Sequence, residues 1–159
     1  MLAALSLVLL LLSLPAIAQD PVNKFKEEFD QEKDPVRKAR LLPRLGDAQL
    51  DEAGDYVGKG EMARALTLLE EYRDSVKAAH EALKSSGINA EKKPKGFKQL
   101  EIHLRQGIRR MEDIIVAVPY DDRKPFEAIR KQLEGIDQEL IEMLFPRRPG
   151  KHPPLKDKL

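Results

Sequence analysis

Two histidines are the residues of this sequence whose type and spacing could do chemistry. His80 and His103 lie seven residues before and seven residues after the ends of a polar loop, 87–96. If the flanking segments form an antiparallel helical hairpin, both imidazoles fall at about the same level, with Glu81 and Glu101 close to them in sequence. Imidazole and carboxylate groups together bind borderline divalent ions. His80 and His103 are therefore candidate metal ligands, and the alternative is two histidines that flank a core seam.

The sequence contains no recognised motif for other catalytic chemistry or for binding a cofactor. There is no cysteine, which excludes disulfides, thiolate zinc, iron–sulfur clusters and a cysteine nucleophile. Gly-rich phosphate loops, G-x-S-x-G, H-E-x-x-H and EF-hand loops are missing too. The acidic groups at 70–74 and 134–137 are interpreted as solvated helix faces, because acid–base catalysis needs a carboxylate with a shifted pKa in a cleft. We expect no enzyme activity and no cofactor.

Charge and aromatic content together argue against one class of partner, the nucleic acids. The chain has 28 Lys and Arg against 27 Asp and Glu, a formal net charge of +1. It also has no tryptophan, three tyrosines and five phenylalanines, which leaves little surface for stacking on bases. Both features argue against a nucleic-acid partner.

Residues 1–18 have the pattern of a secretory signal peptide. None of these eighteen residues is charged, and Pro15 ends the apolar run. Small residues at Ala16 and Ala18 predict cleavage between Ala18 and Gln19. The alternative is an uncleaved membrane anchor, since eighteen residues approach the minimum span. We expect export to the periplasm or the medium, and no membrane span in the mature chain.

The mature chain reads as one all-α domain over 19–145. Apolar residues at steps of three and four predict helices at about 21–33, 35–57, 61–85, 95–118 and 122–145. The last three should form an antiparallel bundle, with the two N-terminal helices packed on it. Pro43 should kink the second helix, because it cannot donate to the carbonyl of Ala39. The inward residues expected in the last helix are Phe126, Ile129, Leu133, Ile136, Leu140 and Met143.

Two glycines, Gly107 and Gly135, fall in the middle of expected helices. A glycine there costs ~1 kcal/mol relative to alanine. A close helix crossing would compensate for that cost, and the alternative is simple tolerance.

The tail at 146–159 has four prolines and one glycine, with five basic residues and one acidic. This composition predicts a disordered basic segment. It could bind an anionic polymer or lipid headgroup, or it could be a solvated terminus without a role.

The stretch 53–72 resembles part of a tetratricopeptide motif. Five residues stand in the order that such a repeat uses for its small, aromatic, turn and apolar positions: Ala53, Tyr56, Gly60, Ala65 and Leu69. The second helix is too long for a 34-residue repeat, and no second copy follows. The resemblance implies a helical hairpin that recognises a peptide. Otherwise the chain is similar to uncharacterised exported all-helical proteins of bacteria.

Together these patterns predict an exported, non-enzymatic helical module that binds a protein or peptide through a groove or associates with itself. The alternative is a metal- or ligand-binding envelope protein that uses His80 and His103.

Overall fold

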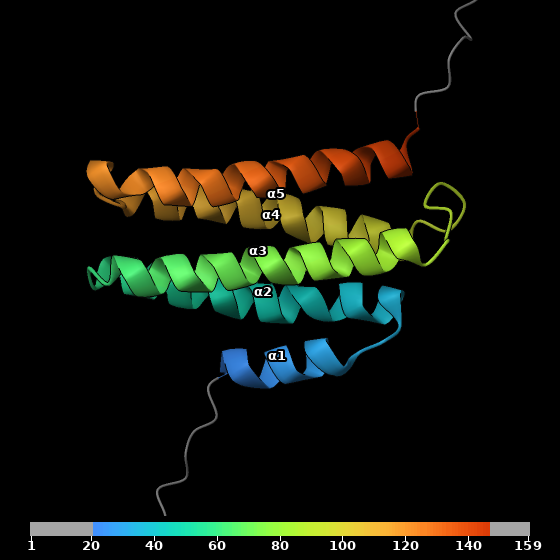
Figure 1. Cartoon of the computed structure of the whole chain (residues 1–159), viewed down its shortest axis with the longest axis horizontal. Helices are drawn as coiled ribbons and strands as arrows, with labels where there is room; N and C mark the ends of the chain where they lie inside the picture. Colours follow the sequence, from blue (N-terminus) through green and yellow to red (C-terminus); the bar gives the residue numbers. More distant parts are fainter. Residues whose placement is uncertain (1–20, 147–159) are drawn as a thin grey trace, which may run out of the picture.

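The computed structural model describes residues 21–146, and five α-helices account for most of them (Figure 1). The helices are α1 (Pro21–Gln31), α2 (Pro35–Gly58), α3 (Met62–Ser85), α4 (Lys95–Ala117) and α5 (Arg123–Leu144), with one 3₁₀ turn, η1 (Tyr120–Asp122), before α5. No strand occurs within these residues. The expected all-α helical bundle is confirmed. The predicted signal peptide lies outside the described residues, as does the tail after Pro146.

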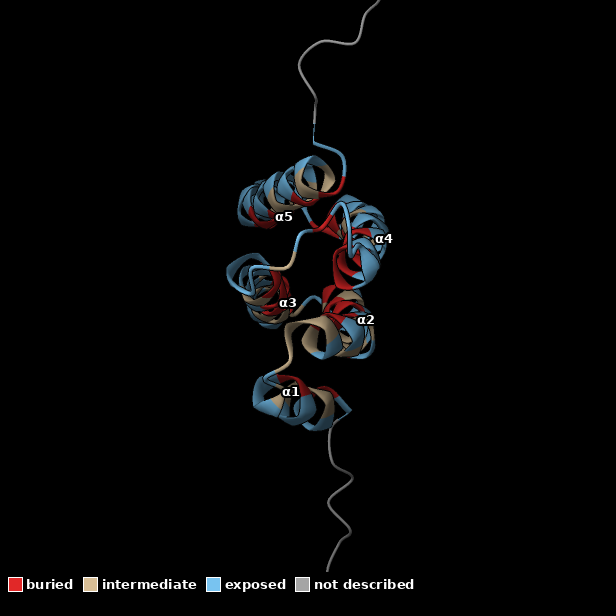
Figure 2. Cartoon of the chain, turned by 90° about the vertical axis from the view of Figure 1, so that its right-hand side faces the viewer, coloured by how far each residue is buried: buried red, intermediate tan, exposed pale blue. Residues whose placement is uncertain are grey.

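Four long helices, α2 to α5, enclose the core, and α1 lies outside them against α2 (Figure 2). Consecutive long helices run in opposite directions (Figure 1). The α2 helix is as long as α3 and packs closely on both α3 and α4. It is therefore a full member of the bundle, alongside the three long helices that the sequence placed there.

The α3 and α4 helices are not close neighbours, although one loop joins them. Each packs mainly on α2 and α5, and the two occupy opposite corners of the four-helix arrangement (Figure 2). The loop at 86–94 is long enough to cross between the corners. The hairpin that the sequence predicted from these two helices is thus antiparallel but diagonal.

Capping residues set several helix ends where the sequence placed them. The carboxylate of Asp34 accepts a hydrogen bond of 2.7 Å from the backbone N–H of Arg37, and Pro35 follows as the first helical residue. Gly60 and Gly87 take φ values of +77° and +72°, which ordinary residues rarely adopt. They form the turns that follow α2 and α3.

One continuous apolar core joins all five helices. Its largest fully buried side chains include Phe29, Tyr72, Phe97, Met111 and Phe126. The stripe expected on α5 faces inward as predicted: four of its members are buried, and Ile136 and Met143 are half-buried against the core.

The α2 helix continues unbroken through Pro43, and the predicted bend there stays a prediction.

The two glycines in the middle of helices differ in what lies next to them. Gly107 lies where Tyr72 crosses from α3: an added Cβ would stand 2.9 Å from Cζ of that ring and closer still to its hydroxyl oxygen. Gly135 has nothing within 4 Å. The atoms nearest to Gly107 belong to the Tyr72 side chain and not to the backbone of a crossing helix, so the glycine makes room for a ring instead of the expected helix crossing, whereas Gly135 is simply tolerated.

Candidate functional site

His80 lies in the seam between α3 and α5 and is almost fully buried. Its Nε2 is 3.7 Å from a carboxylate oxygen of Glu139 on α5, and its Nδ1 is 3.7 Å from Glu81. Lys84 pairs with the same Glu139 oxygen at 3.2 Å. Burial lowers the pKa of His80, while the two carboxylates act in the opposite direction. The imidazole is therefore a neutral group that borders surface ion pairs.

His103 is also buried, but it faces α2 and α3. Its Nε2 is 3.4 Å from the hydroxyl of Tyr72, and the two rings meet edge to face with centroids 5.9 Å apart. Gly46 of α2 leaves the space that this pair needs, because an added Cβ would stand 2.5 Å from Nε2 of His103. Burial lowers the pKa of His103.

The structure does not bring the two histidines together. Tyr72, which contacts His103, precedes His80 by eight residues, or ~12 Å along the α3 axis. His80 is turned toward α5 and His103 toward α2, because α3 and α4 stand at opposite corners of the bundle. Within residues 21–146 no group of three or more His, Cys, Asp or Glu side chains could hold a metal ion. The expectation that both imidazoles share one level is wrong.

Two carboxylates between α4 and α5 are shielded from solvent, although one of them, Asp137, belongs to a group that was expected to be solvated. Glu101 is buried and forms an ion pair with Arg105. Asp137 is half-buried, and burial raises its pKa although Arg105 lowers it. Glu134 does fit the expected solvated face, since it is exposed and lies 3.6 Å from Arg130. Asp137 is thus part of a helix seam.

The short α1 helix shows how the outer surface of α2 and α3 holds a helix. The guanidinium of Arg44 stands 4.8 Å from the ring centre of Phe25, and the ammonium of Lys38 stands 4.6 Å from that of Phe29. Lys38 also donates a 2.8 Å hydrogen bond to the carbonyl of Phe29. Each aromatic anchor of α1 is therefore covered by a cation from α2.

Beyond the N-terminal end of α1, none of the described residues lies over the same surface. Figure 1 shows α1 stopping well short of the turn that joins α2 to α3. A groove of about 490 Å³ lies there, which we call the hairpin groove. It is lined by Glu52 and Tyr56 of α2 and by Ala63, Arg64, Thr67 and Leu68 of α3.

The hairpin groove continues the surface on which α1 lies. On α2, Tyr56 follows Lys38, which contacts Phe29 of α1, by eighteen residues or about five full turns, and Glu52 lies one turn before Tyr56, so the three share one face. On α3, Thr67 in the groove and Ser75 beside α1 are likewise eight residues apart. One pair of helical faces therefore holds α1 over part of its length, and no other residue between 21 and 146 covers the rest.

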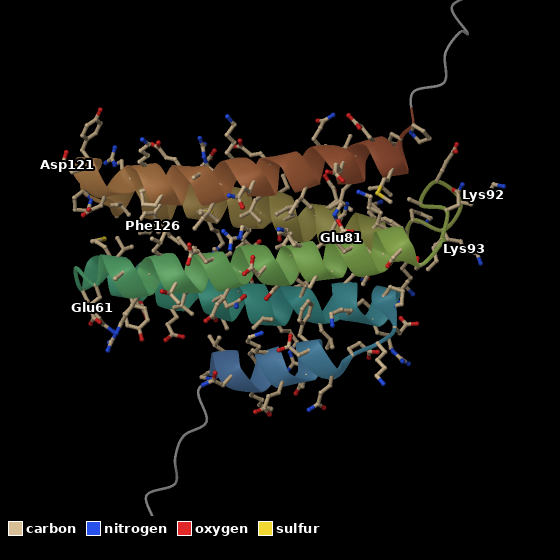
Figure 3. All side chains as sticks on the ribbon, in the orientation of Figure 1. Glu61, Glu81, Lys92, Lys93, Asp121 and Phe126 are labelled. Carbon is tan, nitrogen blue, oxygen red and sulfur yellow. The ribbon has the colours of Figure 1, made fainter. Side chains whose placement is uncertain are left out.

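Both signs of charge meet around Tyr56 in the groove. Lys59 and Arg64 stand 5.6 and 5.5 Å from the centre of its ring. A hydrogen bond from the Tyr56 hydroxyl to Glu52 raises the pKa of Tyr56. Arg64 is also bonded at 2.7 Å to Glu61, which Figure 3 labels at this end of α3. The wall that surrounds the aromatic ring is polar.

The five residues of the tetratricopeptide-like pattern lie on this hairpin. Ala53, Ala65 and Leu69 are buried between the helices, Gly60 is in the turn, and Tyr56 faces the groove. The pattern did not single out the other groove residues. The signal that could have found them is their spacing, by whole helical turns, from the residues beneath α1.

The predicted cleavage site, Ala18–Gln19, lies outside the described residues. None of the five helices between residues 21 and 146 combines the length and the apolar character that crossing a membrane requires. Comparison with protein-family models, with curated proteins and with solved structures gives no match for this chain.

Proposed function

We propose that the protein is an exported, non-enzymatic helical module that binds a segment of a partner protein in the hairpin groove. The proposal rests on one observation: among the described residues, α1 covers only part of the surface that α2 and α3 form together. The surface under α1 binds an amphipathic helix, and its continuation past Pro21 offers Tyr56, Ala63 and Leu68 to solvent or to a partner. Binding an amphipathic segment in a groove between helices is a common mode of peptide recognition.

Exposed apolar residues elsewhere give weaker support to self-association. Ile102, Val116, Tyr120 and Phe145 are the exposed large apolar side chains of the described residues. Val116 and Tyr120 lie near the connection from α4 to α5, whereas Phe145 follows the other end of α5. Dispersed residues of this kind are normal on a monomer. The hairpin groove is therefore the better candidate.

Site-specific photo-crosslinking in the cells that make the protein tests the proposal. A photoreactive amino acid at Thr67, which is exposed in the groove, should capture a partner protein. The matched control carries the same amino acid at Gln132, an exposed position on α5. A partner captured from position 67 and not from position 132 supports the proposal. Equal capture at both positions, or none at 67, contradicts it.

Export is tested separately on the protein recovered from outside the cytoplasm. N-terminal sequencing should find Gln19 as the first residue. An intact Met1 on the exported protein would favour the uncleaved anchor.

A further inference from the structure

Positive charge is concentrated at the end of the bundle opposite to the hairpin groove. Two connections lie at this end, each with the first helical turn that follows it, at 32–38 and 86–98 (Figure 1). These segments hold seven basic residues against three acidic ones. The corresponding segments at the other end, 59–65 and 118–126, hold four against three. A chain that is almost neutral as a whole therefore has one basic end.

Two of the three carboxylates at this end are already bonded. Glu32 forms an ion pair with Arg37 at 3.1 Å, and Asp34 accepts the backbone N–H of Arg37 as the cap of α2. Four exposed lysines, by contrast, have no ion-pair partner within residues 21–146: Lys92, Lys93, Lys95 and Lys98. Their charges are available to a partner.

The loop before α4 holds two of these lysines in place. The side chain of Asn89 accepts a hydrogen bond of 2.9 Å from the backbone N–H of Lys92, and its carbonyl accepts one of 2.9 Å from that of Lys93. Ala90 is buried and anchors the loop on the core. In Figure 3 the side chains of Lys92 and Lys93 point away from the helices. The loop thus presents both ammonium groups to solvent.

The start of α4 directs the other two lysines outward. A Cβ added at Gly96 would stand 3.3 Å from Cα of Val36, so this turn lies directly against α2. Gly96 and Phe97 are buried by this packing. Lys95 and Lys98, on either side of them along the helix, are exposed. All four lysines therefore lie on one surface for the same reason, the packing of the residues between them.

An exposed aromatic ring and a second basic segment begin at the same end. Phe145 follows α5 there and is 73% exposed. The tail at 146–159 continues from it with five basic residues and one acidic. Lysine is a point charge on a flexible stem, which suits a field of phosphates better than one fixed pattern of carboxylates. An aromatic ring among such cations is typical of segments that lie at the interface of an anionic bilayer.

We propose that this basic end, defined by the four lysines and Phe145, binds the surface of an anionic lipid bilayer. The lysines are attracted to the charged headgroups, and the ring of Phe145 enters between them. The hairpin groove lies at the other end of α3, whose 24 residues span ~36 Å. A partner in the groove would therefore stand clear of the bilayer. This proposal is independent of the hairpin groove, because the two surfaces share no residue.

Sedimentation with lipid vesicles tests the proposal on the full protein. Vesicles of phosphatidylcholine with added phosphatidylglycerol should bind the protein, and vesicles of phosphatidylcholine alone should bind it much less. A leader that is still attached would enter both kinds of vesicle alike, so the difference between them reports the effect of charge. Poly-glutamate stands in for an acidic protein and should not displace the protein from the anionic vesicles.

Matched variants assign the binding to the basic end. Lys92→Gln with Lys93→Gln should weaken binding about 25-fold, since each cation at an anionic surface contributes about fivefold. Lys124→Gln with Lys131→Gln removes the same charge from the first half of α5 and should leave binding unchanged. Phe145→Ser should weaken binding ~tenfold through the loss of apolar burial. All five positions are exposed, so these variants should fold.

Several results would overturn the proposal. Equal binding to both kinds of vesicle would show that charge is not recognised. Equal weakening by the two lysine pairs would show that the attraction is general or belongs to the tail. Full binding by Phe145→Ser, or displacement by poly-glutamate, would indicate an acidic protein as the partner instead of a bilayer.

Discussion

The substitution of alanine for Gly107 tests the packing at the centre of the bundle. In an isolated helix this change stabilises by ~1 kcal/mol. In the folded protein the added Cβ would stand 2.9 Å from Cζ of Tyr72 and closer still to its hydroxyl oxygen. Tyr72 is fully buried and cannot retreat, because Gly46 already stands against its other edge: a Cβ there would be 2.7 Å from Cε2.

The expected result is a loss of stability despite the better helix propensity. Overpacking a well-filled core costs ~1–3 kcal/mol, which exceeds the propensity gain over most of that range. Gly135→Ala is the matched control, since that glycine is also mid-helix but has nothing within 4 Å. We expect it to raise the free energy of unfolding by up to ~1 kcal/mol. The two substitutions should therefore have opposite signs.

Urea unfolding followed by circular dichroism measures both variants. The difference between them equals the overpacking cost of ~1–3 kcal/mol, which corresponds to a separation of about 0.5–1.5 M in the urea midpoint at an m-value of about 2 kcal/mol/M. The double variant Gly107→Ala with Tyr72→Phe removes the hydroxyl that clashes, so it should recover part of the loss, in a non-additive way. If Gly107→Ala stabilises the protein as much as Gly135→Ala does, the close contact of Tyr72 with α4 is wrong.

Three further predictions concern charge and capping. The folded protein holds His80 and His103 at lowered pKa values, so near pH 6.5, the ordinary pKa of histidine, the unfolded chain binds more protons than the folded one. The free energy of unfolding should therefore fall as the pH drops through that value. A curve with no fall there would contradict the burial argument. Asp137→Asn should stabilise the protein at neutral pH, because burial raises the pKa of this carboxyl and disfavours its charge. The gain in stability should vanish in acid, where Asp137 is protonated in both the folded and the unfolded protein. A gain that persists in acid would point to another cause. Asp34→Ala should cost ~1 kcal/mol in urea unfolding through loss of the α2 cap, and no change would show that the 2.7 Å bond adds nothing.

Local sequence patterns were sufficient to predict the helices. Steps of three and four between apolar residues place the helices and most of their buried faces, because an α-helix repeats every 3.6 residues whatever lies beside it. The Asp34–Pro35 pair and Gly87 marked helix ends for equally local reasons. The turn at Gly60 was found in the same way.

The candidate sites depended on which helices became neighbours. His80 and His103 have the right spacing for a shared level, but spacing along the chain does not say that α3 and α4 lie at opposite corners. The hairpin groove exists because α1 is shorter than the surface on which it packs. The spacing of apolar residues predicts the lengths of α1 and of the helices beneath it, but it does not show where along them α1 packs.

The sequence alone therefore determined the helices, their buried faces and the absence of recognised catalytic motifs. Only the tertiary structure decided that Tyr72 contacts His103, that Gly107 cannot carry a side chain and that Asp137 lies in a seam. The physical reason is that helix formation follows from bonds four residues apart, whereas these contacts depend on how whole helices pack, which is fixed by the combined shape of side chains far apart in the chain.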